Sequence, residues 1–339
     1  MATPTKQMQR VLDVYGSFNA PPLETLSPSN ARKMPTLKNA VEEMAAESLG
    51  ARATQLLKPM PEPVGKVSHI VMPSSEGDLL ARVYTPKGDG PFPVLVYFHG
   101  GGWVIANLDV YEPSCRALCN AAGCIVVSVA YRQAPEHKYP AAVNDAYAAT
   151  QWVLTNARQL NGDPTRVAVG GESAGANLAT VTCLKTIREG GQKPLMQLLI
   201  YPVTDARMAY PSYEEHREAV PLHAAMMPWF WQHYLENEVD GQQPYASPVL
   251  ADEDDLNELP PATIITAEID PLRDEGEAYA QRLKEVGVAV EAKRYEGVTH
   301  EFFGLAGVVD TAQEALAYAA THLKRAFERQ STTDAASQA

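Results

Sequence analysis

A serine flanked by small residues stands where a buried strand is expected to end and a helix to begin. The pentapeptide Gly171-Glu172-Ser173-Ala174-Gly175 follows an apolar run and precedes a helical pattern. In such a G-x-S-x-G turn, the strained backbone exposes the serine hydroxyl, and the glycines leave room where side chains would collide. The free N–H groups of the following helix favour developing negative charge. Because an ordinary strand–helix turn also uses Gly and Ser, the pentapeptide alone does not establish Ser173 as a nucleophile.

A second glycine-rich segment, His99-Gly100-Gly101-Gly102-Trp103, follows the apolar run at 93–98. Consecutive glycines let backbone N–H groups approach a ligand closely, and such donors can stabilise the oxyanion of a tetrahedral intermediate. We expect Gly101, Gly102 and the N–H of Ala174 to supply these donors, and His99 to hold the loop. The alternative is a flexible glycine turn, which the bulky Trp103 disfavours.

An acid and a base follow two later apolar runs. Asp270 comes after the run at 262–268, and His300 comes after the run at 290–296. The order Ser, Asp, His is that of one class of serine hydrolases, in which the histidine takes the serine proton and the aspartate orients the imidazole. Before Pro271, Asp270 could instead be a helix N-cap, and Glu268 and Asp274 remain competing acids.

The elements that must position these residues alternate along the chain. Two β-rich runs around a turn at 74–77 read as a hairpin, and short apolar runs of the kind buried in parallel sheets follow. Strand–helix alternation predicts an α/β fold with a doubly wound sheet. The expected strands are 93–98, 124–131, 166–171, 195–202, 262–268 and 290–296, and the expected helices are 109–122, 140–160, 174–189, 274–287 and 310–328.

Two stretches fall outside this series. Residues 1–60 carry helical patterns without a strand, and residues 205–240 are rich in aromatic residues and Met. We predict that both form a helical cap over a catalytic domain made of 61–204 and 241–330. The alternative for 205–240 is a buried helix of the main domain. The small, polar residues 331–339 are expected to be disordered.

Composition restricts the partners. The formal net charge of −13 disfavours nucleic acid and anionic membrane surfaces, and no apolar run is long enough to span a bilayer. Cys115 and Cys119 would lie one helical turn apart, but no nearby ligands complete a metal site, so we expect buried free thiols and no metal. The N-terminal residues lack the apolar run of a signal peptide, which favours the cytoplasm.

Taken together, the motifs resemble those of the bacterial hormone-sensitive-lipase-like esterases, within the α/β-hydrolase superfamily. The similarity extends from about Pro93 to Phe303. It includes HGGGW (99–103), YRQAPEHKYPAAVNDAYAA (131–149), GGESAGANLA (170–179), YP (201–202), LPPATIITAEIDPLRDEGEAYA (259–280) and GVTHEFFG (297–304).

The resemblance implies an α/β-hydrolase fold with a mostly parallel eight-stranded sheet, flanking helices and a helical cap. It implies a carboxylesterase that hydrolyses short- to medium-chain acyl esters of small molecules without a cofactor. Ser173, Asp270 and His300 would be the triad, with Gly101, Gly102 and Ala174 as the oxyanion hole. An amidase side activity stays open, and a homodimer is compatible with the sequence. Glu172 and Glu301 depart from the Asp and Gly usual in the family, which affects hydrogen bonding around the triad.

Overall fold

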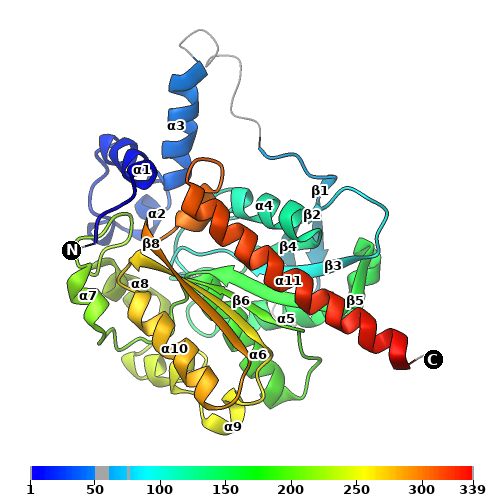
Figure 1. Ribbon diagram of the computed structural model, residues 1–339. Helices are drawn as coiled ribbons and strands as arrows, with labels where there is room; N and C mark the ends of the chain where they lie inside the picture. The colour runs from blue at the N-terminus through cyan, green and yellow to red at the C-terminus, as the bar shows by residue number, and fades with distance from the viewer. Residues whose placement is uncertain (1, 50–60, 75–76, 338–339) are drawn as a thin grey trace.

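An eight-stranded sheet forms the centre of the molecule, and the computed structural model describes residues 2–49, 61–74 and 77–337 (Figure 1). The strand order is β1-β2-β4-β3-β5-β6-β7-β8. Strand β2 is antiparallel to β1 and β4, and the other neighbouring pairs are parallel, which confirms the expected sheet and its initial hairpin. The strands are β1 (Lys66–Met72), β2 (Leu79–Thr85), β3 (Phe92–Phe98), β4 (Ile125–Val129), β5 (Gly162–Glu172), β6 (Gln197–Ile200), β7 (Ala262–Ile269) and β8 (Val290–Thr299).

Helices cover both faces of the sheet because side chains of the central strands alternate between two apolar cores. On β3, Val94 and Val96 face the core formed with α5 (Ala141–Asn156), α6 (Ala174–Glu189) and α10 (Arg273–Glu285). Leu95 and Tyr97 face the opposite core, which α4 (Glu112–Ala122) and α11 (Asp310–Ser337) complete. These are the strongly apolar, two-sided strands that the sequence predicted.

The helix ends follow from local sequence. Pro113 lies in the first turn of α4, where a missing N–H costs nothing. Helices α4 and α6 both end at a glycine in the left-handed conformation, Gly123 and Gly190 respectively, which has no Cβ to clash.

Helix α11 has no glycine at its end, and it continues to Ser337. The expectation of a disordered tail from Ser331 is therefore wrong as far as Ser337, because these small residues extend the helix instead of ending it.

The two stretches outside the strand–helix series are helical. The first contains α1 (Lys6–Ser17), α2 (Pro28–Ala31) and α3 (Leu37–Leu49), and residues 50–60 of the predicted cap segment lie outside the described residues. The second contains α7 (Pro211–Glu215) and α8 (Met226–Tyr234). Figure 1 shows both groups at the end of the sheet toward which the arrowhead of β8 points. A short helix, α9 (Glu253–Leu256), precedes β7.

Candidate active site

Ser173 occupies a strained turn between β5 and α6. Its φ is 57° and its ψ is −121°, which are values that residues other than glycine rarely adopt. A Cβ on Gly175 would lie 2.0 Å from the carbonyl oxygen of Phe98, so only glycine lets α6 begin this close to β3. The amide of Ser173 donates a hydrogen bond to the carbonyl of Ile200 at 2.9 Å, which fixes the turn against β6.

The turn brings the serine hydroxyl to a histidine and an aspartate from the ends of β8 and β7. The Nε2 atom of His300 lies 3.0 Å from Ser173 Oγ, and its Nδ1 atom lies 2.7 Å from Asp270 Oδ2. All three side chains are buried, with Ser173 5% exposed. With the proton on Nδ1, the imidazole donates to Asp270 and presents a free Nε2 lone pair to the serine.

Asp270 contacts both the backbone and the histidine. Its Oδ1 atom accepts a hydrogen bond from the amide of Leu272 at 2.9 Å, while Oδ2 faces His300. The N-cap alternative is wrong, because α10 begins at Arg273 with Leu272 as its N-cap. The two competing acids are engaged elsewhere. Asp274 pairs with Arg273 at 2.7 Å, and Glu268 accepts a hydrogen bond from the amide of Gly297 at 2.7 Å.

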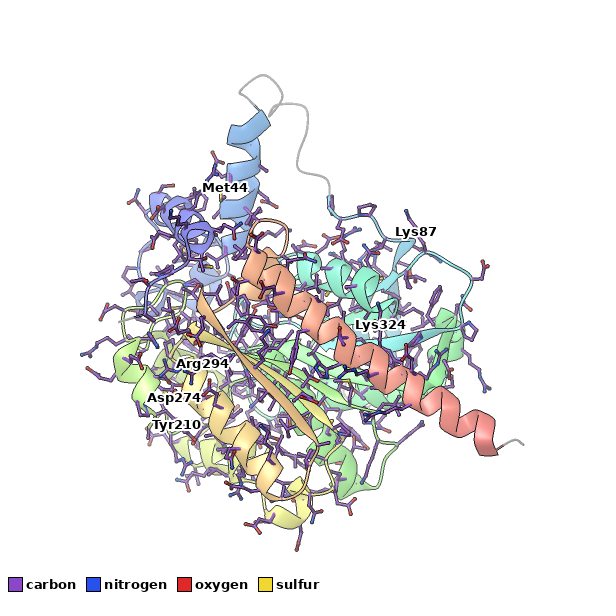
Figure 2. The ribbon with its side chains drawn as sticks, in the orientation of Figure 1. Met44, Lys87, Tyr210, Asp274, Arg294 and Lys324 are labelled. Carbon is purple, nitrogen blue, oxygen red and sulfur yellow. The ribbon has the colours of Figure 1, made fainter. Side chains whose placement is uncertain are left out.

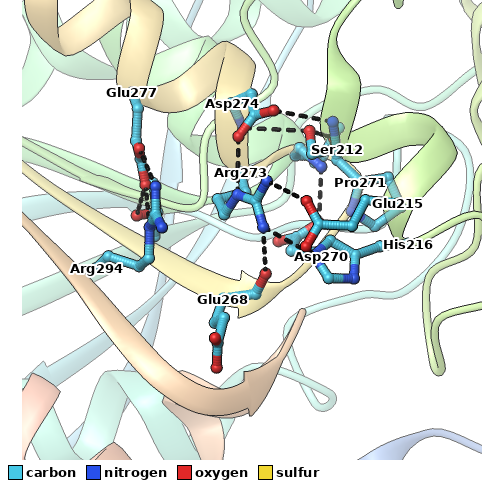
Figure 3. Close-up of polar contacts among 12 residues, drawn as sticks. Ser212, Glu215, His216, Glu268, Asp270, Pro271, Arg273, Asp274, Glu277 and Arg294 are labelled. Atoms are coloured by element: carbon cyan, nitrogen blue, oxygen red, sulfur yellow. Dashed lines mark hydrogen bonds and ion pairs between the residues drawn. The ribbon is translucent and has the colours of Figure 1, made fainter. Parts of the chain in front are cut away.

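Arg273 anchors the loop that carries Asp270 (Figure 3). Its guanidinium contacts Asp274, Glu215 at 2.7 Å, His216 at 2.8 Å and the carbonyl of Glu268 at 3.2 Å. These contacts join α10, α7 and the end of β7, on the flank where Asp274 is labelled in Figure 2. No sequence pattern predicts this role, because Glu215 is 58 positions away from Arg273.

The glycine loop after β3 lies beside the same serine. Gly101 and Gly102 have φ values of 100° and 56°, which favour glycine. Within the described part of the chain, neither of their backbone N–H groups, nor that of Ala174, donates a hydrogen bond to another residue. Three unpaired donors near a buried serine hydroxyl fit the geometry of an oxyanion hole.

Two side chains hold this loop. His99 Nδ1 lies 2.7 Å from the carbonyl of Gly100, and its ring stacks on Tyr131 with centroids 4.4 Å apart. Burial lowers the pKa of His99 to about 4, so the ring is neutral at pH 7. Arg32 of the N-terminal segment, which the sequence analysis missed, donates to the carbonyl of Val104 at 2.8 Å and pairs with Glu136 at 2.6 Å.

Carboxylates surround His300. Burial by itself lowers its pKa, but the charges of Asp270, Glu301 and Glu172 outweigh burial, so the pKa is raised above its ordinary value. Glu172 is buried and accepts short hydrogen bonds from the hydroxyls of Tyr97 and Tyr201. Burial raises the pKa of Glu172, and these hydrogen bonds oppose that effect.

A cavity of about 590 Å³ opens over Ser173 and His300. Its walls come from the glycine loop and from both segments outside the strand–helix series. The segment after β6 contributes mainly apolar side chains, and the N-terminal segment contributes a mixture. The lining includes Tyr15, Asn19, Leu23, Arg32, Met34, Asn39, Gly101, Gly102, Asn107, Val203, Leu222, Met226, Met227, Phe230 and Glu301.

The four cysteines are buried free thiols, as the sequence predicted. The described residues contain no group of three or more His, Cys, Asp or Glu side chains that could hold a metal ion. Among the helices formed by those residues, none is long and apolar enough to cross a membrane.

Comparison with known proteins identifies a hydrolase family model and relatives named as ester hydrolases. A family model described as the alpha/beta hydrolase fold matches residues 95–304. The chain is 39% identical over 294 residues to a carboxylic ester hydrolase, LipN, of Mycobacterium tuberculosis, covering 84% of this chain and 78% of that protein. It is 37% identical over 256 residues to the ethyl acetate hydrolase of Pseudomonas putida, covering 74% of this chain and 80% of that protein.

Solved structures extend the similarity to nearly the whole chain. A thermostable esterase from Pseudomonas putida superposes with a TM-score of 0.85 at 36% identity, covering 96% of this chain and 98% of that one. A hyperthermophilic esterase from Pyrobaculum calidifontis gives a TM-score of 0.82 at 38% identity, covering 96% and 99%.

The carboxylates around His300 predict the pH dependence of Ser173 reactivity. A histidine accepts the serine proton only when neutral, so a raised pKa shifts the acid-side loss of reactivity above the ordinary value of about 6.5. We expect the rate of Ser173 labelling by a fluorophosphonate to fall as pH drops through this raised value. Glu301→Gln removes one of the contributing charges and should move the midpoint to lower pH. A wild-type midpoint at or below about 6.5 would contradict the electrostatic argument.

Proposed function

The chain belongs to the α/β-hydrolase family of hormone-sensitive-lipase-like esterases and hydrolyses carboxylic esters, and on this premise we propose that it does so through an acyl-enzyme on Ser173. The observation that carries the proposal is the continuous hydrogen-bonded chain from Ser173 through His300 to Asp270, with both distances at or below 3.0 Å. In this mechanism Ser173 is the nucleophile, His300 the general base and Asp270 the orienting acid.

In the first half-reaction, Ser173 Oγ attacks the ester carbonyl carbon while its proton moves to His300 Nε2. The carbonyl oxygen becomes an oxyanion, which the N–H groups of Gly101, Gly102 and Ala174 stabilise. When the tetrahedral intermediate collapses, the bond to the leaving oxygen breaks, and that oxygen takes the proton from His300. An alcohol leaves, and the acyl group remains on Ser173.

In the second half-reaction, water attacks the acyl carbon as His300 takes its proton. The same N–H groups hold the second oxyanion, and the proton returns from His300 to Ser173 Oγ as the acid is released. Asp270 stabilises the imidazolium in both steps. Every proton transfer in this mechanism therefore passes through His300 Nε2, which lies 3.0 Å from Ser173 Oγ.

The first prediction of this mechanism concerns Ser173. Ser173→Ala should lower kcat for p-nitrophenyl acetate by about 10⁶-fold, because the nucleophile is absent while oxyanion donors remain. A fluorophosphonate should label the wild type once and should not label the variant. Circular dichroism checks that the variant is folded. Labelling of another serine, or substantial turnover by the folded variant, would refute the assignment of Ser173.

A second variant pair separates Asp270 from its neighbour. Asp270→Asn retains the shape of the side chain but removes the charge and allows the wrong tautomer of His300, so kcat should fall by about 10⁴-fold. Asp274→Asn weakens the pair with Arg273 and keeps an oxygen that can accept the hydrogen bond from the amide of Ser212, so it should cost less than about tenfold. Equal losses in the two variants would show that the charge of Asp270 has no special role.

We also propose that the described part of residues 1–60, which is 2–49, forms together with residues 205–240 a cap that limits acyl length. Supporting this, Leu222, Met226 and Phe230 line the cavity, and a Cβ on Gly102 would lie 2.2 Å from the ring of Phe230. The apolar wall thus packs directly against the glycine loop. An acyl chain gains about 0.8 kcal/mol per buried methylene until it reaches this wall. The enzyme should therefore prefer short to medium chains.

Shortening one wall residue tests this limit. Leu222 is 5% exposed, and Leu222→Ala should open room for longer chains. We expect the ratio of kcat/KM for p-nitrophenyl octanoate to that for p-nitrophenyl butyrate to rise at least about fourfold. This is the fold-change that corresponds to the free energy of burying one methylene group, about 0.8 kcal/mol. Val239→Ala is the control, because Val239 is 67% exposed and does not line the cavity. An unchanged ratio in a folded Leu222→Ala variant would place the acyl chain elsewhere.

A further inference from the structure

Among the described residues that line the cavity, Glu301 is the only carboxylate. It follows His300 directly and is partly buried. Its Oε1 atom accepts a hydrogen bond from the hydroxyl of Tyr111 at 3.2 Å, and no hydrogen bond from the described part of the chain reaches Oε2. The φ of Glu301 is 64°, a left-handed conformation that favours glycine. Burial raises the pKa of Glu301, and the charge of His300 opposes that effect. An acidic side chain held in a strained backbone beside a reacting centre is an indication of function.

The basic side chains described in the cavity wall already have partners. Arg32 pairs with Glu136 at 2.6 Å, and His223 lies 3.1 Å from Glu24. His300 contacts Asp270 and Ser173. Within the described lining, Glu301 is therefore the acid that no basic side chain pairs with. The net charge of −13 adds a long-range field that attracts cations and repels anions.

The position of Glu301 indicates which part of an ester it meets. His300 must give its proton to the leaving oxygen, so the leaving alcohol lies on the side of His300. Glu301 follows His300 in the lining of the cavity, which Tyr15 also lines, and burial together with the charge of Glu301 raises the pKa of Tyr15 to about 12. The apolar wall, which includes Leu222 and Met226, comes from a different segment. The cavity thus has an apolar part suited to an acyl chain and an acidic part beside the leaving group.

We propose that Glu301 binds a positively charged amine, quaternary or protonated, on the leaving alcohol of the substrate, and so directs the enzyme toward esters of amino alcohols. This inference rests on the proposed function. A carboxylate in a partly desolvated pocket attracts such a cation and repels an anionic leaving group, because Arg32, the arginine among the described lining residues, is already paired with Glu136. Glu301 is a specificity-determining residue in this proposal, and the bond-making steps do not change.

A pair of isosteric esters tests the proposal directly. Acetylcholine and 3,3-dimethylbutyl acetate share the acyl group and have nearly the same shape, but only acetylcholine carries a positive charge. The measured quantity is the ratio of their kcat/KM values. It is determined on the alkaline plateau of each pH profile, so any change in the pKa of His300 cancels.

Three variants define the origin of this ratio. Glu301→Gln should lower it by about five- to tenfold, as expected for loss of one ion pair at a partly buried site. Glu301→Asp retains the charge and should preserve most of the preference. Glu253→Gln is the matched control, because it removes the same charge from an exposed position on α9, away from the cavity. It should leave the ratio unchanged.

Wild-type measurements keep the test decisive if Glu301→Gln does not fold. Choline should inhibit hydrolysis of p-nitrophenyl acetate more strongly than 3,3-dimethylbutanol, and added salt should weaken that difference. Equal inhibition, or a ratio within about twofold between wild type and folded Glu301→Gln, would overturn the role of Glu301. Failure to hydrolyse acetylcholine while p-nitrophenyl acetate reacts would do the same. Absence of any Ser173-dependent ester hydrolysis would instead overturn the proposed function.

Discussion

The site depends on one strained backbone position, the turn at Ser173. A non-glycine residue at φ 57° and ψ −121° costs about 1–3 kcal/mol, which surrounding contacts must offset. The hydrogen bond from the amide of Ser173 to the carbonyl of Ile200 provides one such contact. The absence of side chains at Gly171 and Gly175 leaves room for the turn. Because the start of α6 then contacts the end of β3, the serine hydroxyl and the glycine loop come together. A single steric constraint therefore positions both the nucleophile and the N–H groups proposed to stabilise its oxyanion.

The segment after β6 does more than line the cavity. Ser212 of α7 donates a hydrogen bond to the carbonyl of Pro271 at 2.6 Å, and Glu215 pairs with Arg273. Both contacts fall on the loop that carries Asp270. The cavity wall and the acid loop are thus joined through α7, and a change in this segment can alter the orientation of Asp270 as well as the shape of the pocket.

Two buried histidines near the serine show how surroundings decide protonation. His99 contacts a carbonyl and an aromatic ring, and burial lowers its pKa to about 4. His300 is equally buried but is surrounded by the carboxylates of Asp270, Glu301 and Glu172, and its pKa is raised. Burial penalises the charged form of both rings, and only neighbouring negative charge reverses that penalty. His300 can therefore hold a proton that His99 cannot.

The sequence by itself predicted the sheet and the helices around it, and it singled out Ser173 and His300 as candidates, because local apolar patterns and tight-turn chemistry are encoded in short segments. It left Asp270 in competition with Glu268 and Asp274, since three carboxylates within seven positions look alike until their directions are known. Only the tertiary structure placed Asp270 against His300, brought Arg32 to the glycine loop, and made Arg273 the anchor of the acid loop. These contacts join residues far apart in the chain, and only folding fixes their distances and orientations.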